Sequence, residues 1–153
     1  MFSHDASQPG NGSSAIRYLE SAVRSASPPR LRLMLIERAV GLCQAISDRW
    51  TANRPSDGCD EQTLQLRDIM TELLAGVGKS DLPVALQVAD LYVFLSQHLT
   101  SAEMSCDVSM IREIGLVLEI EAETWRIVCE TASQQAQRVP STLPRTSGLN
   151  LHG

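Results

Sequence analysis

The sequence predicts an all-α protein, an antiparallel four-helix bundle with a short N-terminal lead segment and disordered tails. Hydrophobic residues make up 43% of the 153 residues but aromatic residues only 4%, and the apolar residues are mainly Leu, Ala, Val and Ile. This composition favours helices over strands. Apolar residues also recur at steps of three or four over four stretches, which Pro and Gly separate. A chain of this length suits one domain with one core.

The composition changes along the chain and predicts three parts. Residues 1–14 are rich in Ser, Gly and Asn, and residues 133–153 contain two prolines and two glycines between polar residues. Both read as disordered tails. Residues 15–132 are expected to form the helical bundle domain. Within that domain, the lead segment Ala15–Val23 is predicted to be a short helical or extended stretch ahead of the first long helix.

The first long helix is predicted to begin at Ser27-Pro28-Pro29. A hydroxyl side chain can cap a helix, and proline is tolerated in the first turn, where its missing amide hydrogen costs nothing. From Leu31 to Trp50 two neighbouring rows of apolar residues recur at helical spacing. So broad an apolar face predicts contact with more than one neighbour. The stretch Thr51–Cys59, which holds a proline and a glycine, is predicted to be a loop.

Three further helices are expected. The second spans about Asp60–Val77, where glycines on either side of Val77 mark its end. Ser80–Pro83 opens the third helix, which is apolar over much of its circumference. The fourth begins near Ser105 or Asp107 and ends at about Thr131. Because the connections are short, neighbouring helices are predicted to run antiparallel.

Charge and hydropathy exclude several kinds of partner. The net charge is -5, and the 13 basic residues, of which only Lys79 is a lysine, form no dense stripe of the kind that neutralises phosphates. Nucleic acid is therefore not expected as a partner. The longest apolar run, Leu91–Leu95, is far shorter than a membrane span, and the first residues have no basic start or apolar core of a signal peptide. The sequence predicts no membrane insertion and a cytoplasmic location.

Cysteine spacing does not indicate a metal site. Cys43, Cys59, Cys106 and Cys129 are far apart, whereas zinc sites use close pairs such as Cys-x2-Cys. The expectation is four free thiols that are buried or partly buried. No metal and no cofactor are predicted.

Two short patterns resemble parts of a phosphate-binding loop and of a catalytic pair, but both are incomplete. Gly78-Lys79-Ser80 resembles the end of a phosphate-binding loop, but that loop needs a glycine where this chain has Leu73, and the segment follows a helix instead of a strand. Glu119 and Glu123 share a helix face but have no nearby histidine, so a solvated acidic face is expected. Neither pattern therefore predicts a catalytic or nucleotide-binding site.

His98 supports an alternative interpretation, because phosphorelay proteins use one exposed histidine on a four-helix bundle as a phosphoacceptor. Such domains follow that histidine with a Lys and a small Gly, whereas here Leu99-Thr100-Ser101-Ala102 follows. A histidine near a helix end that interacts with terminal carbonyls is the structural alternative. A histidine phosphotransfer bundle and a generic helical interaction module both remain open from the residues alone.

One segment resembles a known family. Tyr18, Val23, Ser25-Ala26-Ser27-Pro28, Leu31 and Leu33-Met34-Leu35 fall at the spacing of the signature of FliS-family flagellin-export chaperones. That signature has Tyr, four residues, Val, one residue, Thr-Ala-Ser/Thr-Pro, two residues, Leu, and shortly Met-Leu-Tyr.

The resemblance is weaker in the later helices. Leu91–Leu95 resembles the family's third-helix pattern, and Glu123–Arg126 resembles the Trp-centred end of its last helix. The chain departs from the family pattern at Ser25, where the family has Thr, and at Ile36, where it has Tyr. The loop from Thr51 to Glu61 is also longer than usual in the family.

The resemblance implies a cytoplasmic chaperone that binds the disordered C-terminal segment of flagellin in apolar grooves. It further implies that the chaperone prevents premature polymerisation, assists delivery to the flagellar export apparatus and catalyses no reaction. Wide apolar helix faces suit helix-in-groove recognition, although they also suit a simple core. A homodimer is compatible with this reading. The predicted partner-binding residues are Tyr18, Val23, Leu31, Leu35 and Ile36.

Overall fold

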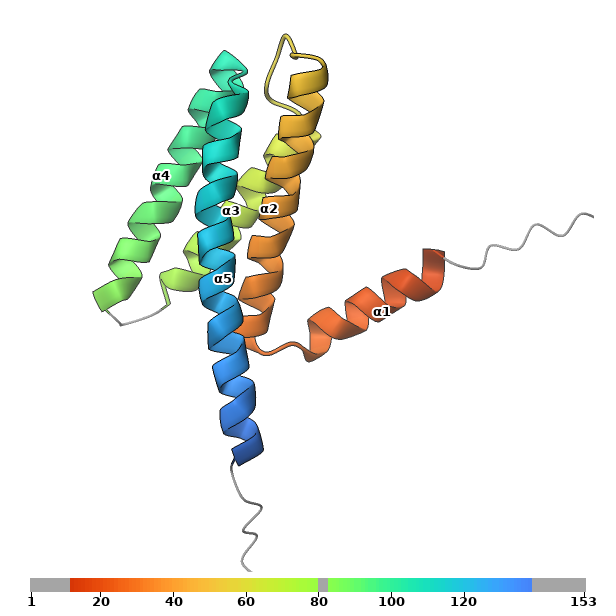
Figure 1. Cartoon of the computed structure of the whole chain (residues 1–153), viewed down its shortest axis with the longest axis vertical. Coiled ribbons are helices and arrows are strands. Elements are labelled where there is room, and N and C mark those ends of the chain that lie inside the picture. Colours follow the sequence, from red (N-terminus) through yellow and green to blue (C-terminus); the bar gives the residue numbers. More distant parts are fainter. Residues whose placement is uncertain (1–11, 80–82, 139–153) are drawn as a thin grey trace, which may run out of the picture.

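A computed structural model describes residues 12–79 and 83–138 and contains five helices (Figure 1). The prediction of an all-α fold is confirmed. The helices are α1 (Gly12–Ser25), α2 (Pro28–Ala52), α3 (Glu61–Val77), α4 (Pro83–Ser105) and α5 (Val108–Arg138).

Helices α2 to α5 form the predicted four-helix bundle. Helix α2 packs against α3 and α5, and α4 packs against the same two helices, so each helix has two neighbours. The broad apolar face predicted for α2 is therefore used on two sides. Helix α1 stays outside this arrangement and points away from the bundle (Figure 1).

The core runs along the centre of the bundle and takes apolar side chains from all four of its helices. Among the fully buried large side chains, Tyr92 is aromatic and nearly all the others are Leu or Ile, so the core depends mainly on the packing of branched aliphatic residues. The fully buried large side chains are Leu33, Ile36, Ile46, Leu66, Met70, Leu73, Tyr92, Leu95, Leu99, Ile111, Ile114 and Leu118.

The helix ends largely follow the predicted signals. Helix α2 begins at Pro28 as expected, but the hydroxyl of Ser27 makes no capping hydrogen bond, so the prolines themselves define this start. At α3, Asp60 and Thr63 cap each other reciprocally, with two bonds of 3.0 Å between backbone amides and side-chain oxygens. Gly78 follows the last residue of α3.

A tight corner joins α4 to α5. Cys106 has a left-handed backbone with φ of 51°, and the amide of Ser109 donates to the Asp107 carboxylate at 2.8 Å to start α5. The loop after α2, which leads to α3, lies beside this corner. The Arg54 guanidinium donates to the carbonyl of Ser105 at 2.8 Å. The loop after α2 therefore covers the end of α4, which gives its unusual length a structural role.

Two helices are longer than the sequence predicts. The lead segment is helical throughout and begins at Gly12, and α5 continues to Arg138 instead of ending near Thr131. The added turns of α5 are polar, so periodicity of apolar residues does not reveal them. The predicted start of the third helix at Ser80–Leu82 lies outside the described residues, as do 1–11 and 139–153 of the predicted tails.

Candidate partner-binding surface

Helix α1 carries the first predicted contact residues. Tyr18 is 75% exposed and Ile16 is 58% exposed, and no other helix covers them. Val23 lies in the same helix, but its side chain is outside the described residues. An exposed aromatic and an exposed branched residue on an isolated amphipathic helix are available to a partner.

The other predicted contact residues lie on α2 and are not brought together with Tyr18. Leu31 and Leu35 are half-buried, and Leu35 packs against the core. Ile36 is 0% exposed and belongs to the core itself. Ile36 therefore has no free surface for a partner in this arrangement of the helices. Its place among the predicted contacts reflects the family signature, whereas its burial reflects the direction of the α2 core face.

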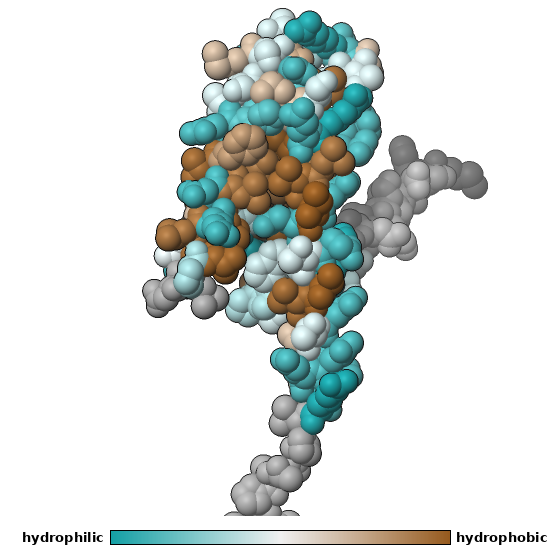
Figure 2. Space-filling view, turned by 60° about the vertical axis from the view of Figure 1, so that its left-hand side comes forward, coloured by the Kyte–Doolittle hydropathy of each residue, from teal (hydrophilic) through white to brown (hydrophobic). Residues whose placement is uncertain are grey.

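A larger apolar surface lies on α4 and α5, where sequence reasoning placed no site. Phe94 is 54% exposed and Ile120 is 70% exposed. Figure 2 shows apolar side chains gathered over the side of the bundle on which α4 lies. We define the α4–α5 surface by its exposed large apolar residues: Val84, Leu86, Val93, Phe94, Ile120, Ile127 and Val128.

Two polar contacts define how α4 and α5 lie against each other. His98 Nε2 is 2.7 Å from Oε2 of Glu113, and the Tyr92 hydroxyl donates to the Glu121 carboxylate. With the helices antiparallel, this register places Phe94 near the level of Val117 and the start of α4 near the level of Val128. Exposed apolar residues of the two helices therefore occur at matching levels along the bundle axis.

A partly buried polar cluster supports this side from within. The Arg32 guanidinium donates to the Tyr92 hydroxyl at 2.9 Å, and its Cζ lies 4.9 Å from the ring centre of Trp125. Burial, followed by the hydrogen bond to Glu121, raises the pKa of Tyr92 above its usual 10.0. The hydroxyl thus stays a proton donor at neutral pH. The cluster joins α2, α4 and α5. The role of Arg32 could not be predicted from the spacing of apolar residues.

His98 lies within α4, well before its end, so the predicted contact with terminal carbonyls is wrong. Its ring stacks on Phe94 with centroids 5.5 Å apart, its side chain is 19% exposed, and Glu113 engages Nε2. A carboxylate at the ring nitrogen also repels an incoming phosphoryl group. This geometry gives the phosphotransfer interpretation no support.

Other predicted features are placed plainly by the structure. Glu119 and Glu123 are exposed as expected, whereas Glu121 is half-buried against Tyr92. All four cysteines are unbridged, but Cys59 is exposed and so departs from the prediction. Among the described residues, no group of His, Cys, Asp and Glu is arranged to hold a metal ion. Within the same ranges, no helix has the length and apolarity needed to cross a membrane.

A helical bundle that leaves such large apolar side chains exposed has the build of a chaperone that binds another chain. The comparison with family models identifies which one. The model for the flagellar protein FliS matches residues 11–132. The chain belongs to the FliS family of flagellar export chaperones, and the resemblance seen in the sequence is confirmed. A search among curated proteins finds no match.

Proposed function

We propose that this chaperone binds the disordered C-terminal segment of flagellin and holds it, as helical pieces, against the α4–α5 surface. The observation that carries the proposal is the exposure of this surface. Monomeric soluble proteins rarely leave a continuous apolar patch uncovered unless it binds something. Membership of the FliS family supplies the class of partner. An amphipathic client helix laid along α4 and α5 meets apolar side chains on both.

The energetics favour a segment that is disordered before binding. Ordering the client costs several kcal/mol, and burying its apolar face returns roughly 25 cal/mol per Å2. Because both terms are large, a wide interface is compatible with an affinity that still allows release. The apolar residues of the client are buried against the chaperone while it is bound. They are therefore not available for polymerisation. Delivery of this complex to the flagellar export apparatus in the cytoplasm is part of the proposal.

The lead segment takes a second part of the same client. Tyr18 lies on α1, which is attached to α2 but is not covered by the rest of the bundle, so its side chain is free to contact a partner. Leu31 and Leu35 lie on the neighbouring part of α2 and are only half-buried. With Val23, these residues remain the proposed contacts at this end. In calorimetry with a flagellin C-terminal peptide, Tyr18→Ala should weaken binding, and an unchanged affinity would remove Tyr18 from the proposal.

Co-expression with the cognate flagellin tests the function as a whole. A pull-down through the chaperone should recover full-length flagellin and lose flagellin that lacks its C-terminal segment. Equal recovery of both clients contradicts the proposal. No catalytic step enters the mechanism, in line with a family of chaperones.

A further inference from the structure

One carboxylate interrupts an otherwise apolar row of α5. Val117, Glu121, Trp125 and Val128 recur at steps of three or four residues and so share one face of the helix. The hydrogen bond between Glu121 and Tyr92 shows that this face turns towards α4. Val117 and Trp125 are half-buried and Val128 is 40% exposed, so the row lies at the border between the core and the α4–α5 surface.

The two oxygens of the Glu121 carboxylate have different surroundings. Oε2 accepts from the Tyr92 hydroxyl, which itself accepts from the Arg32 guanidinium, so Arg32 reaches the carboxylate only through this hydroxyl. Within the described residues, Oε1 has no hydrogen-bond partner and is not enclosed, so it is left to water in the free protein. Because Tyr92 is fully buried, it anchors the carboxylate at a fixed place with one oxygen open.

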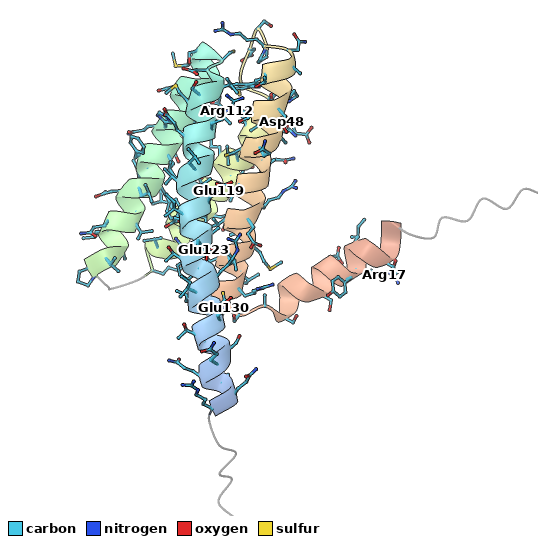
Figure 3. All side chains as sticks on the ribbon, in the orientation of Figure 1. Arg17, Asp48, Arg112, Glu119, Glu123 and Glu130 are labelled. Carbon is cyan, nitrogen blue, oxygen red and sulfur yellow. The ribbon has the colours of Figure 1, made fainter. Side chains whose placement is uncertain are left out.

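No lysine or arginine of α4 or α5 balances this carboxylate. Helix α4 contains two acidic residues and no lysine or arginine. On α5, Arg112 donates to the hydroxyl of Thr51 at 3.1 Å, and Figure 3 shows it beside α2. Arg126 pairs with Glu37, which also belongs to α2, and Arg138 is the last residue of α5. In the described part of the chain, the side of α5 that faces α4 is therefore acidic and complements a cationic partner.

A client helix that covers the α4–α5 surface removes water from Oε1 of Glu121. An unpaired carboxylate in a covered apolar surface costs free energy, whereas a cation within hydrogen-bond distance offsets that cost. A single polar position in an apolar seam also fixes the register of the helices that meet there, as in coiled coils. The surface therefore discriminates between client helices by the residue that each brings to Glu121.

We propose that Glu121 is a specificity-determining residue, which accepts a lysine or arginine side chain from the apolar face of the client helix and so fixes the register of that helix along α4 and α5. The inference rests on the proposed binding of flagellin to this surface. Tyr92 is a positioning residue, because it holds the carboxylate and is itself fully buried. The exposed apolar residues supply contact area, and Glu121 supplies the choice between clients.

A double-mutant cycle between chaperone and client tests this role. The probe is a labelled peptide of the flagellin C-terminal segment, in which each lysine and arginine is replaced in turn by glutamine. Glu121→Gln removes the charge but keeps an amide oxygen for the Tyr92 hydroxyl, so urea unfolding should keep the wild-type midpoint. With the unaltered peptide, its dissociation constant should be at least about fivefold higher than that of the wild type. One peptide substitution should weaken binding to the wild type by a similar factor and leave binding to Glu121→Gln nearly unchanged.

Glu119→Gln is the matched control. It removes the same charge from the same helix, but Glu119 is exposed and lines the pockets between α5 and α2 (Figure 3). It should bind every peptide like the wild type, and an equal loss in both variants would assign the effect to net charge and overturn the proposal. A merely structural role of Glu121 would weaken all peptides alike. Binding without coupling to any basic residue, or by a segment that has none, overturns this inference alone, whereas no binding to the wild type removes the proposed function as well.

Discussion

Substitution of Ile120 by aspartate is expected to weaken flagellin binding without unfolding the bundle. Ile120 is 70% exposed, so the free protein loses little when it becomes polar. Full burial of such a side chain is worth about 1.5–3 kcal/mol, and a client that covers the exposed part recovers about 1–2 kcal/mol. The dissociation constant should therefore rise at least about 5–30-fold. Burying the new carboxylate adds to this loss.

Fluorescence anisotropy with a labelled peptide from the flagellin C-terminal segment measures this change. Met104→Asp is the matched control, because Met104 is 84% exposed near the C-terminal end of α4, where the exposed polar residues Gln97 and Ser101 separate it from the α4–α5 surface. It should bind like the wild type, and urea unfolding of both variants should stay within about 0.5 kcal/mol of it. Wild-type affinity for Ile120→Asp would refute the reasoning. An equal loss in Met104→Asp would show that added charge, and not the position, is responsible.

Three further outcomes follow from the packing. Ile36→Ala should cost about 2–5 kcal/mol in urea unfolding because Ile36 has no exposed surface, and a loss below about 1 kcal/mol would place it outside the core. Gly58→Ala should destabilise by at least about 1–3 kcal/mol, because its new Cβ would lie 2.4 Å from the carbonyl oxygen of Glu103; Gly41→Ala, with nothing within 4 Å, should be neutral or stabilising. Burial raises the pKa of the Cys43 thiol to about 12, so at pH 8 a thiol reagent should label Cys59 quickly and Cys43 only on unfolding; equal labelling of both in the native protein would contradict this burial.

The helices of the bundle could be predicted from the sequence because their signals are local. Pro28 marks the start of α2, and Asp60 marks the start of α3, through residue types whose backbone or side chain acts within one turn. The ends of α1 and α5 could not be predicted in the same way. Their terminal turns have no buried apolar face, so the spacing of apolar residues does not mark where these helices end.

The contact surface was harder to predict because periodicity identifies an apolar face but not what covers it. Ile36 and Leu35 are neighbours in the sequence and equally apolar, yet only Ile36 points fully into the core. The α4–α5 surface depends on the register between two helices, which the contact of His98 with Glu113 reveals and the sequence does not. The apolar circumference predicted for α4 was the available signal. Its meaning required knowledge of which neighbours α4 has.

The central claim is that an ordered chaperone surface takes up the disordered C-terminal segment of flagellin. Isothermal titration calorimetry of the wild-type chaperone with that isolated segment, repeated at several temperatures, tests the claim most directly. Binding that buries apolar surface and orders the segment should show saturable heat and a clearly negative heat-capacity change. Absence of binding by the isolated segment, under conditions in which full-length flagellin binds, would contradict the account.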